Sequence, residues 1–334
     1  MPTTATRPDG AQSDFERAAA PYRRELLAHC YRMLGSLHDA EDQVQETYLR
    51  AWRSYGAFEG RSSLRSWLYR IATNACLTAL EQRARRPLPA DFGDPADPER
   101  PVVAAREVPW LEPAPDALLA PAPGADPAAV VASREASRLA FVAALQHLPP
   151  RQRAVLLLRD VLRWRAAEVA ELIGASTAAV NSALQRARAR LAEVAPDRDA
   201  LAEPGDPAAR ALLDRYARAF EDADVAALVE LFRRDAVWDM PPYPEWFAGP
   251  EAIGRLVAAQ CAPEPGELRP VATAANGQPA VALYRRGADG VHRAFQLQVV
   301  SVTAGGISRV TAFFDPALFD AFGLPAHLAP GVPG

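Results

Sequence analysis

Two short amphipathic stretches separated by one glycine narrow the possible folds of this chain more than any other feature. They lie in LRWRAAEVAELIGASTAAVNSALQRARARL, Leu162 to Leu191. Gly174 suits the left-handed backbone of a tight turn, and Ser176 can cap the helix that follows it. The buried faces expected at helical spacing are Val169, Ala170 and Ile173 in the first helix and Val180, Leu184, Ala187 and Leu191 in the second. The pattern predicts a helix-turn-helix, for which the alternative is an ordinary three-helix bundle with a solvated arginine face.

In a helix-turn-helix, the second helix enters the major groove of DNA, and its outward residues contact bases and phosphates. The outward positions here combine short polar side chains near the start of the helix with arginines near its end. The candidate DNA-binding residues are Thr177, Asn181, Ser182, Gln185, Arg186 and Arg188.

Charge divides the chain into four parts. Arg61 to Arg86 holds six arginines against one acidic residue, and Arg151 to Arg190 holds eight against three. Pro87 to Ala132, between them, is rich in proline and alanine and holds eight acidic residues against two arginines. From Gly205 onwards, 15 acidic residues face 11 arginines. Two basic modules around an acidic linker suggest one nucleic-acid partner that is contacted twice, whereas the acidic last part should not touch it.

The first basic module is predicted to consist of helices. One ends at Gly35, a second begins near Ser36 or His38 and ends before Gly56, and a third runs from Ser62 or Ser63 to Pro87. On the second helix Asp39, Asp42 and Glu46 share one face, which is either a solvated surface or a partner site. On the third, the residues left outside the buried stripe are Trp67, Tyr69, Arg65, Arg70 and Asn74. Interleaved aromatic residues and arginines suit single-stranded DNA, although a lone tryptophan is as often a core residue.

Composition excludes several classes of protein. A chain of 334 residues has room for two or three domains, and a net charge of −4 excludes a basic nucleic-acid coat. Cys30, Cys76 and Cys261 have no metal-binding spacing and suit reduced thiols in a cytosol. No signal-like segment and no window of 18 apolar residues is present, so we expect a cytoplasmic protein without a membrane span, metal or cofactor.

The last part, about Ala208 to Leu328, is predicted to contain two helices, a strand and a third helix, and then alternating strands. Turns are expected at Asn276-Gly277, Ala288-Asp289-Gly290 and Gly305-Gly306. A curved sheet around helices makes a cone with a possible pocket. Its candidate residues are Trp238, Asp239, Tyr243, His292 and Gln296. No convincing acid–base pair stands out, so protein contact and ligand sensing are favoured over catalysis.

Several motifs resemble one known family. HDAEDQVQETYLRAW (from His38), GRSSLRSWLYRIATNACLTAL (from Gly60) and LPPRQRAVLLLRDVLRWRAAEVAELIGASTAAVNSALQRARARL (from Leu148) resemble regions 2 and 4 of sigma-70 factors of the extracytoplasmic-function group. VPWLEPAPDALL (from Val108) and VNSALQRAR (from Val180) are similar to the subgroup with a SnoaL-like C-terminal extension, which is thought to replace a separate anti-sigma protein.

The resemblance implies a multidomain chain with an all-α region 2, a helix-turn-helix region 4 and an α+β SnoaL-like cone. The expected boundaries are 12–86 for region 2, 87–132 for the linker, 133–195 for region 4 and 205–328 for the cone. The expected partners are promoter DNA and core RNA polymerase. Neither a membrane nor a separate anti-sigma protein is expected.

The resemblance also implies roles for particular residues. Asp39, Asp42, Gln45 and Glu46 would face the coiled coil of the largest polymerase subunit. Phe58, Arg61, Ser63, Trp67 and Asn74 would hold melted bases of the −10 element, and the helix from Thr177 would read the −35 element. Many members carry basic residues where this chain has Asn181 and Ala183, which indicates a −35 sequence of its own.

The linker is long enough to reach between two promoter elements. Its 46 residues could extend to roughly 150 Å, whereas two turns of DNA need about 70 Å. Trp110 and Leu111 are too apolar for a plain tether, so we expect them to dock, with the cone as a candidate surface. The chain is thus predicted to be a non-enzymatic promoter-recognition subunit regulated by its cone. The alternative is a one-component DNA-binding regulator with a ligand-sensing or enzymatic cone.

Overall fold

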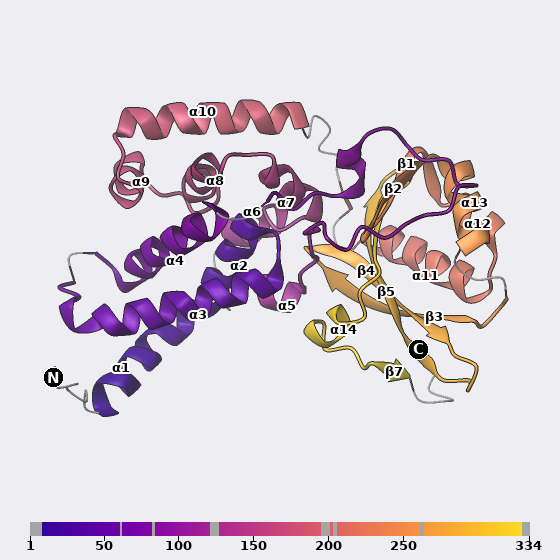
Figure 1. Ribbon diagram of the computed structural model, residues 1–334, viewed down its shortest axis with the longest axis horizontal. Coiled ribbons are helices and arrows are strands. Elements are labelled where there is room, and N and C mark those ends of the chain that lie inside the picture. Colours follow the sequence, from indigo (N-terminus) through magenta and orange to yellow (C-terminus); the bar gives the residue numbers. More distant parts are fainter. Residues whose placement is uncertain are drawn as a thin grey trace. The chain divides into compact units, whose positions relative to one another are not determined.

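The computed structural model describes residues 9–60, 62–81, 84–120, 127–194, 201–202, 206–260 and 264–328, with only the backbone for 9–13 and 127–129. The chain forms two compact units, each built from two separate stretches (Figure 1). The helical unit comprises Met1–Arg85 and Ala117–Pro196, and the sheet unit comprises Arg86–Asp116 and Asp197–Gly334. The predicted linker is therefore divided, because its first thirty or so residues fold with the sheet unit.

The first half of the helical unit contains α1 (Asp9–Ala19), η1 (Ala20–Tyr22), α2 (Arg23–Leu34), α3 (Leu37–Ser54), η2 (Tyr55–Ala57) and α4 (Leu64–Glu81). The predicted boundaries around Gly35 are confirmed: its φ is 72°, and the Ser36 side chain caps α3 by accepting a hydrogen bond from the Asp39 N–H at 3.1 Å. The first predicted helix is interrupted at Pro21, inside η1, because proline removes a backbone donor.

The second half contains α5 (Asp116–Leu119), α6 (Pro127–Glu135), α7 (Leu139–Gln146), α8 (Pro150–Leu156), η4 (Leu157–Val161), α9 (Ala166–Ile173) and α10 (Thr177–Val194). Helices α9 and α10 form the predicted helix-turn-helix. Gly174 has a φ of 64°, and Ser176 Oγ accepts a hydrogen bond from the Ala179 N–H at 3.1 Å. The predicted inner face of α10 is buried at Val180, Leu184, Ala187 and Leu191.

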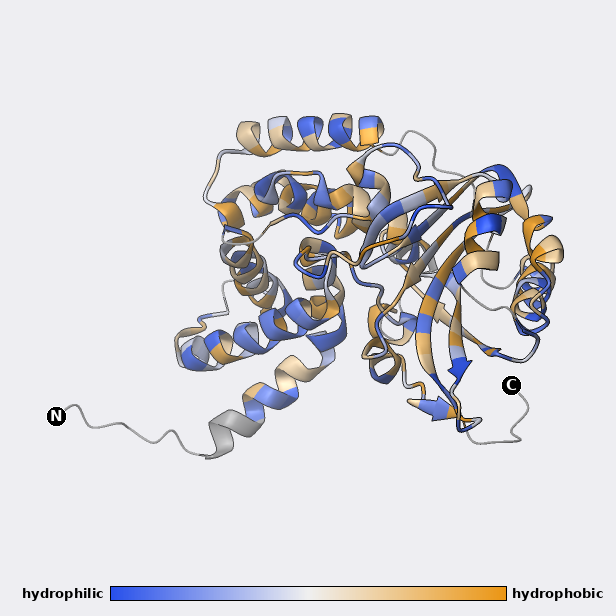
Figure 2. Ribbon diagram, turned by 45° about the vertical axis from the view of Figure 1, so that its right-hand side comes forward, coloured by the Kyte–Doolittle hydropathy of each residue, from blue (hydrophilic) through white to orange (hydrophobic). Residues whose placement is uncertain are grey.

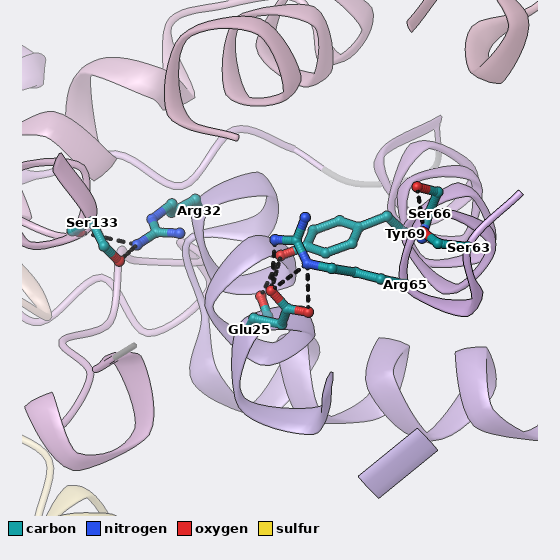
Figure 3. A network of polar contacts seen from close by, with 7 residues as sticks. All are labelled: Glu25, Arg32, Ser63, Arg65, Ser66, Tyr69 and Ser133. Carbon is teal, nitrogen blue, oxygen red and sulfur yellow. Dashed lines mark hydrogen bonds and ion pairs between the residues drawn. The ribbon is translucent and has the colours of Figure 1, made fainter. Parts of the chain in front are cut away.

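Two buried arginines join the halves of the helical unit. Arg32 of α2 donates to the carbonyls of Ser133 and Ala136 at 3.0 and 3.1 Å and to Ser137 Oγ at 2.8 Å (Figure 3 shows Arg32 and Ser133). Arg153 of α8 donates to the Met33 carbonyl in the last turn of α2. Each guanidinium thus satisfies carbonyls that a helix end leaves without intrahelical partners. Burial lowers the pKa of both arginines to about 10, so both stay charged at neutral pH.

The sheet unit contains α11 (Pro207–Glu221), α12 (Val225–Val229), β1 (Phe232–Met240), β2 (Tyr243–Ala248), α13 (Pro250–Gln260), β3 (Leu268–Ala275), β4 (Gln278–Arg286), β5 (His292–Thr303), β6 (Gly306–Phe313), α14 (Leu318–Ala321) and β7 (His327–Leu328). The strand order is β2-β1-β6-β5-β4-β3, with β7 added on β5; β1 and β6 run parallel, and the other pairs are antiparallel. The predicted turn between β3 and β4 is present, with φ values of 58° at Asn276 and 68° at Gly277.

Helices α11, α12 and α13 pack against one face of this sheet (Figure 1). Tyr216 and Phe220 of α11 lie against the strands, with the Phe220 and Trp238 rings 6.4 Å apart. Apolar residues run along the strands (Figure 2), and the main core cluster joins them to the three helices. This burial accounts for the predicted α+β cone.

His29 of α2 makes the stability of the helical unit sensitive to pH. Its ring is buried and lies 3.0 Å from Thr73 Oγ1. Burial, together with the charge of Arg32, lowers its pKa from 6.5 to about 3. Below pH 6.5 the unfolded chain therefore binds a proton at His29 that the folded chain does not bind. Stability is lost as the pH falls from 6.5 towards 3.

We predict that lowering the pH from 7 to 5 costs about 2 kcal/mol through this one histidine, at about 1.4 kcal/mol per pH unit below its unfolded pKa. The His29→Gln variant should lose that part of the pH dependence in urea unfolding experiments. The exposed His38→Gln variant is the matched control and should keep it. An unchanged pH slope in His29→Gln would contradict the assignment.

Candidate nucleic-acid interface and linker contacts

The acidic face of α3 is smaller than the sequence suggested. Asp42 and Gln45 are exposed, and Glu46 is half-buried beside Arg50, with Oε1 2.6 Å from Arg50 Nε. Asp39 is only 5% exposed, which corrects its prediction as part of an exposed stripe. It lies in the first turn of α3, where a carboxylate is favoured by the helix dipole.

Sequence reasoning missed Leu49 on this face of α3. Leu49 is 48% exposed and follows Gln45 by four positions and Asp42 by seven, so the three share one side of the helix. An apolar residue bordered by polar ones is typical of a protein contact surface. The signal was present in the spacing, but a leucine on an amphipathic helix is normally assigned to the core.

The residues predicted for melted DNA form an aromatic cluster at the start of α4. The Phe58 and Trp67 rings are 4.8 Å apart, and the Phe58 ring stacks nearly parallel to Tyr55 at 6.3 Å. All three side chains are half-buried, so each keeps an accessible part. Tyr55 thus joins the predicted residues Phe58 and Trp67 in this cluster.

The other residues of that prediction lie on or beside α4. Asn74 is exposed and shares one face of α4 with Trp67, which lies seven positions earlier. Ser63 is exposed and accepts a hydrogen bond from the Ser66 N–H at 3.1 Å, so it caps α4 (Figure 3). Arg61 lies outside the described residues.

Two arginines of α4 carry carboxylate partners. Arg65 makes a two-pronged contact with Glu25 at 2.7 to 2.9 Å, and its guanidinium lies 4.9 Å from the centre of the Tyr69 ring (Figure 3). Burial lowers the pKa of Arg65, but the Glu25 contact and the Tyr69 hydroxyl together outweigh it, so the pKa is raised. Tyr69 itself is only 1% exposed, which corrects its predicted place outside the buried stripe. Arg70 Nη2 lies 2.6 Å from Glu171 Oε1, and Glu171 belongs to α9 of the helix-turn-helix.

The predicted DNA face of α10 is accessible. Thr177, Asn181, Gln185 and Arg188 recur every three or four residues and are exposed. Ser182 is half-buried and accepts a hydrogen bond from the exposed Arg186 at 2.6 Å. Arg188 also binds Asp160 through two contacts of 2.6 and 2.9 Å. The helix thus presents short polar residues at its start and arginines further along, an arrangement that suits a groove.

The segment Arg86–Asp116, called the strap here, is bound to the rest of the sheet unit at three places. At the first, η3 (Pro89–Phe92) lies against β1 and β2. The Ala90 N–H donates to Asp239 Oδ1 at 3.0 Å, and the indole N–H of Trp246 donates to the Gly93 carbonyl at 2.8 Å. Asp239 is fully buried and also binds Arg309 at 2.8 Å. Burial raises the pKa of Asp239, with the charge of Arg309 opposing the rise.

The second place holds the predicted contact residues Trp110 and Leu111, which are 9% and 0% exposed. The Trp110 indole N–H donates to the Ala105 carbonyl at 2.9 Å, and the Leu111 N–H donates to the Pro87 carbonyl at 3.1 Å. Ala105 in turn binds the Pro242 carbonyl at 2.8 Å. A cavity of about 220 Å³ here is lined by Trp110 and Leu111 together with Pro241, Pro242, Phe313 and Leu318.

The third place is the turn between β3 and β4. The Ala114 N–H donates to Asn276 Oδ1 at 2.9 Å, and the Asn276 N–H donates to the Ala114 carbonyl at 3.0 Å. Asp116 Oδ1 accepts a hydrogen bond from the Gly277 N–H at 2.6 Å. The Asn-Gly pair that predicted the turn therefore also binds the strap, a role that its sequence pattern does not reveal.

The five residues predicted for the pocket do not come together. Trp238 belongs to the core that faces the helices, and Gln296 is paired with Leu283 of the same core. Asp239 alternates to the opposite face of β1, where the strap covers it. His292 lies at the start of β5 and its Nε2 is 3.1 Å from the Gly266 carbonyl. Tyr243 packs edge-on against Phe314 at 5.4 Å. These positions correct the prediction that the five residues line one pocket. Within the described ranges no three His, Cys, Asp or Glu side chains are placed to hold a metal ion.

No helix within the described ranges combines the length and apolar character needed to cross a bilayer. Residues 19–86 match the sigma-70 region 2 family, residues 138–191 match sigma-70 region 4, and residues 213–315 match the SnoaL-like domain family. The first two matches fall in the helical unit and the third in the sheet unit.

Curated relatives agree with these matches. The chain is 58% identical over 323 residues to the ECF RNA polymerase sigma factor SigG of Mycobacterium tuberculosis H37Rv, covering 96% of this chain and 86% of that protein. It is 29% identical over 229 residues to SigJ of the same strain, covering 68% and 63% of the two chains. The crystal structure of SigJ aligns with a TM-score of 0.59 at 23% identity, over 94% of this chain and all of that one, which shows a common fold.

Proposed function

Because the chain belongs to the extracytoplasmic-function group of sigma-70 RNA polymerase sigma factors, we propose that its sheet unit regulates promoter recognition in cis by holding the strap. The observation that carries the proposal is the docking of the strap at three places, with Trp110 and Leu111 buried between its ends. Sigma factors bind core RNA polymerase and promoter DNA. A domain that holds the segment between regions 2 and 4 therefore acts directly on promoter binding.

The polymerase contact is assigned to α3. Asp42 and Gln45 offer an accessible acidic and polar surface, with Glu46 at its edge and Leu49 supplying an apolar centre. A charged rim around an apolar residue gives both steering and affinity in a protein interface. The partner surface is a basic coiled coil of the largest polymerase subunit.

The promoter contacts are assigned to α4 and α10. The Tyr55–Phe58–Trp67 cluster provides aromatic faces for unpaired −10 bases, and Asn74 provides hydrogen bonds beside it. The accessible side of α10 reads the −35 element, with Arg186 and Arg188 on phosphates.

The strap controls the reach of the chain. Leu111 is hydrogen-bonded to Pro87, and Asp116 is only five residues further on, so the docked strap holds its two ends within about 25 Å. Released, the same thirty or so residues extend to about 100 Å. Two turns of DNA require about 70 Å. Docking therefore shortens the connection between regions 2 and 4 by about 75 Å, and release gives that reach back.

We further propose that the sheet unit acts by contact and without a catalytic reaction, and that no separate anti-sigma protein is needed. Asp239, the carboxylate predicted for a pocket, is occupied by Arg309 and by the strap. The alternative of a one-component DNA-binding regulator gives no role to the exposed Asp42–Gln45–Leu49 face. Run-off transcription with purified core polymerase separates the two, since only a sigma factor makes core polymerase initiate at a promoter.

We predict that Asp42→Arg reduces binding to core polymerase at least tenfold, because it places a positive charge opposite a basic partner surface. The matched control is Glu81→Arg, an exposed change at the end of α4. Both affinities can be measured by surface plasmon resonance with immobilised core enzyme. Equal affinity of the Asp42→Arg variant and the control would contradict the docking face.

We predict that Asn74→Ala leaves core binding intact but impairs opening of the −10 region by about 5-fold or more, since a bidentate amide contact to a base edge contributes about 1–3 kcal/mol. Thr78→Ala, one turn further along α4 and also exposed, should behave like the unmodified protein. Permanganate reactivity of promoter thymines reports the opening. Identical reactivity in the two variants would remove Asn74 from the −10 site.

We predict that Trp110→Ala combined with Leu111→Ala frees the strap and raises run-off transcription several-fold, because the connection regains its reach. Val103→Ala is the control, since Val103 lies on the strap but is 69% exposed. Hydrogen exchange of the Ala90 and Ala114 amides should rise in the double variant only. Faster exchange without a change in transcription would show that strap docking is structural and not regulatory.

A further inference from the structure

Arg70 lies on the face of α4 that is proposed to contact melted DNA. It follows Trp67 by three positions and precedes Asn74 by four, so the three residues share one side of the helix. An arginine at that place is suited to a backbone phosphate, because its planar fork binds phosphate and carboxylate oxygens alike. In this structure the fork is turned to a carboxylate of the chain itself, Glu171, at 2.6 Å.

Glu171 belongs to α9, so this ion pair joins region 2 to the helix-turn-helix within the helical unit. Tyr69 reinforces it, because its ring packs edge-on against Trp164, just before α9, at 5.8 Å. Beneath these contacts Arg32 and Arg153 connect α2 to the second half of the unit. Regions 2 and 4 are therefore closed on each other.

The closed helical unit is too short to serve a promoter. Two side chains in contact place the Cα atoms of Arg70 and Glu171 within about 15 Å, Thr177 lies at most about 22 Å beyond Glu171, and Asn74 lies about 6 Å from Arg70. Asn74 and Thr177 can thus be no more than about 43 Å apart along this path, and even Arg188 lies at most about 60 Å from Asn74. Promoter elements two DNA turns apart lie about 70 Å from each other, so the unit has to open before both can bind.

We propose that Glu171 is a stand-in for a DNA phosphate, which holds Arg70 while the helical unit is closed and yields it to the promoter when the unit opens. The proposal rests on the assignment of α4 and α10 to promoter DNA. It adds Arg70 to the DNA contacts and gives an acidic residue of region 4 a role in region 2.

The exposure of the pair sets the size of the effect. The Arg70 and Glu171 side chains are 40% and 70% exposed, and ion pairs of this kind change an equilibrium by about two- to fivefold at most. The buried Arg32 and Arg153 contacts contribute more to closure. Glu171 therefore adjusts the balance between closed and open forms, while the promoter phosphate competes for the same guanidinium.

Two readouts in the full-length protein test the proposal. Closure is followed by energy transfer between dyes on cysteines placed at the exposed positions Thr78 and Ala192, in a Cys261→Ser background. Promoter affinity is followed by the salt-dependent binding of a DNA fragment to the complex with core polymerase. Glu171→Gln should raise the open fraction and the promoter affinity about two- to fivefold. Glu193→Gln, which removes an ion pair within α10, is the matched control and should change neither.

Charge reversal separates the two roles of Arg70. Arg70→Glu alone should open the unit and lower the slope of log affinity against log salt by about one, as expected for one lost phosphate contact. Combining Arg70→Glu with Glu171→Arg should restore closure but not promoter affinity. Unchanged energy transfer in the single variants would overturn the stand-in, and full recovery of promoter affinity in the swap would overturn Arg70 as a phosphate contact.

Transcription by the unmodified protein distinguishes failure of this inference from failure of the proposed function. If it supports run-off transcription while the Glu171 variants match the Glu193 control, this inference fails and the proposed function stands. If it gives no run-off transcript with core polymerase, the proposed function itself fails.

Discussion

The hydrogen bonds that the strap makes with the sheet unit are the constraint on which the rest of the chain depends. Asp239 and Asn276 each pair with a strap backbone amide, at Ala90 and Ala114, and so fix the segment near both of its ends. Neither anchor is a flexible surface contact, since both side chains are fully buried. A buried acceptor that loses its donor costs about 1–3 kcal/mol, so strap and sheet stabilise each other. A connection between two DNA-binding regions has thereby become part of a third domain.

The sequence contains no lysine, so arginine provides its permanently cationic side chains, and the position of each arginine decides what it does. Arg32 and Arg153 are buried at helix ends, where the guanidinium satisfies several carbonyls at once and fixes the fold. Arg70 and Arg188 are accessible and paired with single carboxylates, so their partners can be exchanged for phosphates at little cost. The same side chain is structural where water is excluded and exchangeable where water competes.

Local patterns predicted local structure, and tertiary contacts account for what they missed. The Gly35 and Gly174 caps, the inner face of α10 and the Asn276-Gly277 turn follow from backbone geometry and helical spacing, which neighbouring residues decide. Asp239 was misassigned because its surroundings come from a distant segment, the strap, about 150 positions away in the sequence. The docking of Trp110 was expected from its apolar character. The residues that it contacts could not be predicted, because a proline-rich segment has no helical or strand periodicity that would indicate which side is buried.

Strap release and opening of the helical unit are coupled by chain length. While the strap is docked and α5 and α6 stay helical, the connection between regions 2 and 4 reaches about 60 Å at most, so a separation by two DNA turns favours undocking. Because the strap is part of the same chain, redocking is intramolecular and fast, and only a partner that binds the open form tightly can prevent it. Under the proposed function, core polymerase and promoter together are such a partner. A signal that weakens only a few strap hydrogen bonds, each contributing about 1 kcal/mol, would then shift initiation by an order of magnitude without unfolding any domain.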